Sequence, residues 1–118
     1  MKLRINSKLK SNEKDYEVMC DGEINNDIIK YMDNDVLVEI DLVNNIMKRN
    51  SKDYELIFNF LKDEETSSIL NLKDLEQTIN MKLYTIDVIK KEGYYFINYE
   101  LNDDELFEFE LNYEEVKR

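Results

Sequence analysis

The stretch Asp35 to Leu42 reads DVLVEIDL and decides the fold class of this chain. Its apolar side chains recur at every second position, at Val36, Val38, Ile40 and Leu42, and most of the positions between them are acidic. Because successive side chains of a strand point to opposite faces, this period makes one face apolar and the other charged. The stretch therefore predicts a half-buried β-strand.

The same two-residue period extends from Leu3 to Tyr113 and is interrupted only by short clusters of Asn, Asp, Ser and Gly. Asn44-Asn45 and Glu92-Gly93 are such clusters, and asparagine and glycine tolerate the positive φ that tight hairpins require. We therefore expect about eight to ten antiparallel strands in up-and-down order. A long sheet with one apolar face tends to close on itself, because closure removes exposed edges and buries that face. The predicted fold is an all-β antiparallel meander closed into a barrel.

Two positions depart from the simple period. Gly22 interrupts the second strand, where a glycine commonly marks a bulge or a sharp bend. The alternation of apolar residues also shifts at Tyr84-Thr85, so that Ile86 and Val88 are the residues expected on the inward face after it. Both positions predict local irregularities in otherwise regular strands.

Residues 66–77 have two interpretations. One is a further strand. The other is a short helix, because apolar residues recur there at helical spacing and Thr66 or Ser67 could cap the first turn. The residues of this apolar stripe are Ile69, Leu72, Leu75 and Ile79.

Length and composition predict one barrel domain over residues 1–118 with an acidic surface. The chain has no proline and two glycines, so no flexible linker divides it. Its formal net charge of -11 repels nucleic-acid phosphates and anionic lipid head groups, and we expect neither nucleic acid nor membrane as a partner. The basic residues that come nearest to a patch are predicted to face outward from strands: Arg4, Lys8, Lys10, Lys48 and Arg49.

The single cysteine bears on the compartment and on reactivity. Cys20 cannot form an internal disulfide, and residues 1–9 alternate instead of forming the apolar run of a secretion signal. We therefore expect a cytoplasmic protein. Because Cys20 shares a face with Tyr16 and Val18, we expect it to act as a small buried hydrophobe and not as a nucleophile.

The composition argues against catalysis. The chain has no histidine, which removes the usual general base, the usual partner of a nucleophile and the commonest zinc ligand. Two glycines cannot build a phosphate-binding loop or a nucleophile elbow. The acidic cluster Asp33-Asn34-Asp35 lacks the ligand spacing of a calcium-binding loop. We therefore expect no enzymatic activity, no cofactor and no metal site.

Three motifs stand out along the predicted strands: residues 21–24 (DGEI), 79–85 (INMKLYT) and 95–101 (YFINYEL). Together they resemble the YwiB-like family of bacterial proteins of unknown function. Residues 21–24 (DGEI) are similar to a glycine element of that family after the second strand. Residues 79–85 (INMKLYT) resemble its L-x-I-x-V-x-T strand, and residues 95–101 (YFINYEL) resemble its I-x-I-x-Y-x-L strand. The sequence departs from the pattern at residues 72–74 (LKD), where a Tyr-Gly pair is expected. The resemblance covers nearly the whole chain and implies a calycin-like, lipocalin-like β-barrel, with no established activity to carry over.

The barrel interior is the candidate site, because large aromatic residues fall on the inward face. Two uses of this interior stay open: a solid core with tyrosine hydroxyls that reach the rim, or a cavity for a small amphipathic molecule. Arg118 is the only arginine near the C-terminus, so the buried arginine that holds carboxylates in fatty-acid-binding barrels has no candidate. The candidate ligand-binding residues are Phe58, Phe60, Tyr95, Tyr99 and Phe109.

The sequence supports two functions. The first is a non-enzymatic barrel that binds a small, partly apolar ligand. The second is a protein-interaction or regulatory module whose acidic outer surface, including residues 103–115, binds a basic protein partner. A monomer and a homodimer are both compatible with the sequence.

Overall fold

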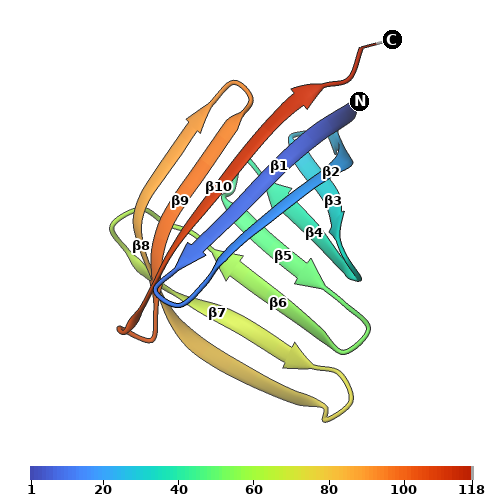
Figure 1. Ribbon diagram of the computed structural model, residues 1–118. Coiled ribbons are helices and arrows are strands. Elements are labelled where there is room, and N and C mark those ends of the chain that lie inside the picture. Colours follow the sequence, from blue (N-terminus) through green and yellow to red (C-terminus); the bar gives the residue numbers. More distant parts are fainter. Residues whose placement is uncertain (118) are drawn as a thin grey trace.

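Ten antiparallel strands form a closed barrel in the computed structural model, which describes residues 1–117 (Figure 1). Each strand pairs with the next along the chain, and β10 pairs with β1 to close the sheet. The strands are β1 (Lys2–Ser11), β2 (Asp15–Asn25), β3 (Ile28–Asp33), β4 (Val36–Asp41), β5 (Ile46–Asn50), β6 (Tyr54–Asn59), β7 (Glu65–Leu72), β8 (Gln77–Lys91), β9 (Tyr94–Leu101) and β10 (Glu105–Glu115). The predicted all-β, up-and-down barrel is confirmed.

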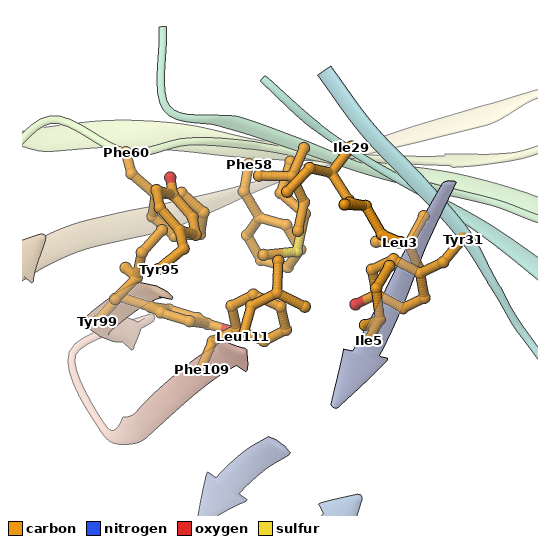
Figure 2. Packing of buried hydrophobic residues seen from close by; sticks show 14 of the residues in the cluster. Leu3, Ile5, Ile29, Tyr31, Phe58, Phe60, Tyr95, Tyr99, Phe109 and Leu111 are labelled. Atoms are coloured by element: carbon orange, nitrogen blue, oxygen red, sulfur yellow. The ribbon is translucent and has the colours of Figure 1, made fainter. Parts of the chain in front are cut away.

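The core lies inside the barrel because alternate strand residues point inward. On β9, Tyr95, Ile97 and Tyr99 are each no more than 4% exposed, whereas the residues between them lie on the outer face. Buried apolar side chains from β1, β3, β4, β5, β6, β8 and β10, together with Phe60 just after β6, complete the cluster. In Figure 2, Phe60 and Tyr95 lie together on one side of this cluster, and Tyr31 lies on the other. The alternation read from the sequence is therefore the alternation that builds the core.

The two ends of the barrel differ. At one end, called the packed end here, the start of β1 and the end of β10 lie together with the β2–β3, β4–β5, β6–β7 and β8–β9 turns. Backbone hydrogen bonds tie these segments together, among them Leu42 N–H to Asp27 O at 3.0 Å and Tyr113 N–H to Gly93 O at 3.0 Å. The other five turns lie at the opposite end, called the open end, which Figure 1 shows splayed around the β1–β2 and β7–β8 hairpins.

At the open end β2 and β3 separate. These strands pair only between residues 22–25 and 28–31, so residues 15–21 of β2 pair with β1 alone. Figure 1 shows the two strands diverging from one another. The sheet is thus continuous at the packed end and has a gap between β2 and the β3–β4 hairpin at the open end.

Gly22 lies where β2 parts from β3, and of the bulge or sharp bend expected there, the bulge is wrong. Pairing with β1 runs through Gly22 without a change of register. A Cβ at this position would stand 2.4 Å from Ile5 Cδ1 and 2.6 Å from the Lys30 carbonyl oxygen. A glycine is therefore needed here because three strands approach one another closely. Sequence alone does not distinguish this requirement from a bulge.

The irregularity predicted at Tyr84-Thr85 is confirmed. The register between β8 and β9 shifts between Thr85 and Asp87, so Ile86 is the extra residue of a β-bulge. After the bulge, Val88 pairs with Ile97 and packs against the core. The shift of apolar phase along β8 was therefore a direct signal of the bulge.

The helix considered for residues 66–77 is wrong. Residues 65–72 form β7, and residues 77–84 return as the first part of β8. The turn between them leaves Leu75 69% exposed, so the apolar stripe never gathers on one face. The Thr66 hydroxyl donates to the Asn59 carbonyl oxygen at 2.6 Å instead of capping a helix. Residues 1–117 contain no helix, and hence none long enough to span a bilayer.

Candidate binding cavity

A cavity of about 620 Å³ opens into the barrel at the open end. Its walls come from β1, β2, β5, β6, β9 and β10 and from the β3–β4 turn. They are mainly aliphatic and aromatic: Leu9, Val18, Val36, Met47, Leu56, Phe58, Leu101, Phe107 and Phe109 contribute, with Tyr16 and Tyr99. The interior is therefore solid at the packed end and hollow at the open end.

A layer of aromatic rings separates the cavity from the core. Phe58 and Phe60 stack with ring centroids 5.5 Å apart, and Tyr99 lies 5.1 Å from Phe60 in a tilted arrangement. Tyr99 also stacks on Phe107, with centroids 5.2 Å apart. These offset and tilted contacts stabilise the layer beyond the apolar area that it buries. These rings form the floor of the cavity.

The five residues predicted for the site divide between the two ends. Phe58, Tyr99 and Phe109 line the cavity, whereas Phe60 and Tyr95 lie in the core behind them. The Tyr95 hydroxyl donates to Asn45 Oδ1 at 3.2 Å, in the β4–β5 turn at the packed end. Sequence alternation placed all five on the inward face. The alternation does not show at which position along the barrel axis the interior is hollow.

Arg49 is the polar residue that sequence reasoning missed. It was expected to face outward, but it lines the cavity and donates from Nη2 to Asp33 Oδ2 at 2.8 Å. The two side chains are 24% and 22% exposed. Burial opposes the charge of the guanidinium, but the bond to Asp33 and its negative charge outweigh burial and raise the pKa of Arg49. Because Ile46 and Met47 are adjacent and both apolar, the sequence does not show which alternate residues of β5 point inward.

Two hydroxyls complete the polar lining. The Tyr31 hydroxyl donates to Ser7 Oγ at 3.1 Å, which leaves the Ser7 hydrogen free to donate elsewhere. No hydrogen bond of the Tyr99 hydroxyl occurs within residues 1–117, and burial raises the pKa of that hydroxyl, so it remains a neutral donor. These two hydroxyls and the unused N–H groups of Arg49 are thus hydrogen-bond donors within the cavity.

Acidic residues lie around the mouth of the cavity and one thiol lies near it. Glu17, Asp33 and Asp35 line the mouth. Burial, followed by the charges of Asp21 and Asp33, raises the pKa of the Cys20 thiol and keeps it protonated. Within the described part of the chain, no three His, Cys, Asp or Glu side chains are grouped as a metal site would need.

The barrel has a counterpart among solved structures. The crystal structure of the ywiB protein from Bacillus subtilis superimposes with a TM-score of 0.65 at 14% sequence identity, over 98% of this chain and 91% of that one. The resemblance to a YwiB-like barrel is thus confirmed, as a likeness of fold. No protein-family model matches the chain. No curated protein matches it by sequence.

Proposed function

We propose that the barrel is a non-enzymatic binding protein that takes a small, partly apolar molecule into the cavity at its open end. The cavity volume of about 620 Å³ carries this proposal. Sites for small molecules typically enclose roughly 300 to 1,000 Å³ and combine apolar walls with a few polar groups. The likeness of fold to the ywiB protein adds no ligand, so the proposal rests on the cavity itself.

The lining supports a ligand with two unlike parts. The Phe58, Phe107 and Phe109 rings offer an apolar surface, and Arg49 and the Ser7 and Tyr99 hydroxyls offer donors. An apolar body that ends in a carbonyl, carboxylate or other acceptor matches this arrangement. A hydrogen bond to a charged group contributes about 1.5 to 3 kcal/mol. Asp33 already accepts one Arg49 N–H at 2.8 Å and offsets the charge of the guanidinium, so the acceptor of the ligand would use the remaining N–H groups and the two hydroxyls.

The absence of catalysis and the cytoplasmic location belong to the same proposal. The chain has no histidine, and its only thiol is held in the protonated form. A protonated thiol is a poor nucleophile. A single free cysteine is also typical of proteins that stay in a reducing compartment.

The test combines native mass spectrometry with a cavity-blocking variant. Protein purified from its host without denaturation is expected to carry a bound small molecule. The neutral fluorescent probe N-phenyl-1-naphthylamine is expected to bind the emptied protein, and Leu101→Trp, which places an indole in the cavity wall, is expected to abolish that binding. Leu106→Trp is the matched control, because Leu106 lies on neighbouring β10 and does not line the cavity.

Two results would overturn the proposal. One is protein that carries no small molecule and does not bind the probe. The other is probe binding that Leu101→Trp leaves unchanged, because the probe would then lie elsewhere on the surface.

A further inference from the structure

Charges on the outer face of the barrel alternate in sign from strand to strand. Going round the barrel, Lys2 of β1 pairs with Glu23 of β2, and Glu23 pairs with Lys30 of β3. The row continues through Glu39 of β4 to Lys48 of β5. Opposite charges at directly paired positions stabilise a sheet and like charges destabilise it. Each acidic residue in this row is thus flanked by a basic residue on both sides.

Three further rows begin in the same way and stop at β2. Residues of β10, β1 and β2 line up as acid, base, acid in each row. The rows are Glu114–Arg4–Asp21, Glu110–Lys8–Glu17 and Glu108–Lys10–Asp15. In each of them the next strand would be β3, but β3 has already turned away from β2 at this level. The acidic residues of β2 therefore lack the basic neighbour that Glu23 has.

The backbone at the same level is also unpaired. Ile24 N–H bonds to Met1 O on the β1 side, and the direction of N–H and C=O groups alternates along a strand. The N–H and C=O groups of Glu17, Met19 and Asp21 therefore point away from β1, toward the gap. Within residues 1–117 no strand pairs with this edge of β2, and Met19 on the outer face beside it is 71% exposed. Edges of this kind are templates for an additional strand.

We propose that the β2 edge, residues 15–21, binds an extended segment of a partner protein in which basic residues alternate with apolar ones. The segment would add as a strand beside β2 and complete the three interrupted rows with its basic side chains. Its apolar side chains would point to the inner face, beside Tyr16 and Val18 at the mouth of the cavity. Strand addition draws affinity from backbone hydrogen bonds and specificity from alternate side chains.

The charges argue against a second copy of this chain as the occupant. An antiparallel pair of two β2 edges would place the acidic outer stripe of one copy against the same stripe of the other. Like charges at paired positions are destabilising. Another unpaired edge, residues 77–81 of β8, has no charged residue and no such interrupted row. Of these two edges, the β2 edge is the one whose charges define a complementary strand.

The probe is a fluorescein-labelled peptide of alternating lysine and valine, with a glutamate and valine peptide as its control. We expect the lysine peptide to bind, to lose affinity as salt is added, and to slow amide hydrogen exchange at Glu17, Met19 and Asp21. Amides of residues 77–81 should be unaffected. The glutamate peptide should not bind measurably.

The decisive variant is Met19→Pro. Its missing N–H would have pointed into the gap, so the β1–β2 ladder should survive, because edge strands accept proline where the N–H faces solvent. We expect the dissociation constant for the lysine peptide to rise about tenfold or more, which corresponds to roughly 1.4 kcal/mol. Met19→Thr keeps the N–H and should bind as the wild type does. Equal melting temperatures of the two variants would show that the barrel remains folded.

A second pair of variants tests the charges. Glu17→Lys with Asp21→Lys should abolish peptide binding, whereas Asp74→Lys with Glu76→Lys makes the same change of net charge in the distant β7–β8 turn and should weaken it much less.

Peptide binding that Met19→Pro leaves unchanged, or protection at β8 in place of β2, would overturn the proposal. So would a dimer, formed without peptide, that Met19→Pro dissociates. Leu101→Trp separates this proposal from the cavity, because it should block the fluorescent probe and leave the peptide site intact.

Discussion

The packed end and the open end of this barrel are built from the same ten strands and the same alternation, yet one is solid and the other hollow. At the packed end, residues such as Ile5, Ile97 and Leu111 have no exposed surface. At the open end, Leu9, Leu101 and Phe107 have the same inward phase but border a cavity. Inward direction therefore does not by itself mean burial. Burial also requires that the strands on the opposite side of the barrel come close enough to fill the space.

The separation of β2 from β3 accounts for the difference. Between residues 22–25 and 28–31 the two strands are hydrogen-bonded, and the interior there is filled. Beyond Gly22 they diverge, and the mouth of the cavity lies between β2 and the β3–β4 turn. The closed sheet and the filled core of the packed end thus support the open end, where the sheet is not fully closed. Function in proteins commonly resides in such less constrained regions.

The largest expected effect contrasts one leucine from each end. Leu111→Ala at the packed end should lower the free energy of unfolding by about 2 to 5 kcal/mol, because the removed atoms leave a void in a filled core. Leu101→Ala should cost less than about 1.5 kcal/mol, since it only enlarges a cavity that already exists. Urea denaturation of both variants measures the difference. Equal losses would mean that the open end is as well packed as the other.

Alkaline pH should destabilise the protein through its buried tyrosines. Burial, only partly offset by the bond to Ser7, raises the pKa of Tyr31 from 10.0 to about 12. Below pH 10 the phenol is neutral in both the folded and the unfolded chain, and its contribution to stability is complete. Between about pH 10 and 12 the unfolded chain ionises first, so the free energy of unfolding should fall by a few kcal/mol.

Tyr31→Phe isolates this contribution, because it removes the ionising group and keeps the ring. Denaturation at a series of pH values should show a shallower decline above pH 10 in the variant than in the wild type. The decline should not vanish, since burial also raises the pKa of Tyr95 at the packed end and of Tyr99 at the cavity floor. Superimposable profiles for the two proteins would contradict a buried, neutral Tyr31.

Gly22→Ala tests the point where the two ends meet. The added Cβ would have to displace both the Ile5 side chain and the backbone at Lys30, so we expect a loss of about 1 to 3 kcal/mol. Cys20→Ala, on the same face of the same strand, should cost less. Chemical denaturation compares the two. If Gly22→Ala were no more costly than Cys20→Ala, the close approach of β1, β2 and β3 would be wrong.

The smallest expected effect concerns the ion pair at the cavity mouth. A double-mutant cycle with Arg49→Met and Asp33→Asn should give a coupling energy of about 1 kcal/mol, because the pair is short and only partly exposed. The more exposed pair of Lys82 and Asp103, in the same half of the barrel, should give a weaker coupling. A larger value for the exposed pair would mean that Arg49 is not held in the cavity wall.

Local patterns in the sequence were sufficient for most of the architecture. The two-residue period determined the strands, the apolar face and the class of fold, and the change of phase at Tyr84-Thr85 located the bulge in β8. Glu92-Gly93 marked a turn, and Gly93 has the positive φ of 74° that such turns require. These features depend on steric preferences and side-chain direction within a few residues, which is why a single sequence contains them.

The hollow level of the barrel, the inward direction of Arg49 and the gap beside β2 depend instead on distant parts of the chain. Whether Phe58 borders a cavity while Phe60 lies in the core is decided by the strands across the barrel, not by β6. The apolar stripe of residues 66–77 also fitted a short helix, and pairing of β7 with β6 and β8 gave its backbone groups partners in the sheet instead. The sequence thus specified which face of each strand is apolar, through a period of two. Only the closure of the sheet set how far apart those faces lie, because that distance is a property of all ten strands together.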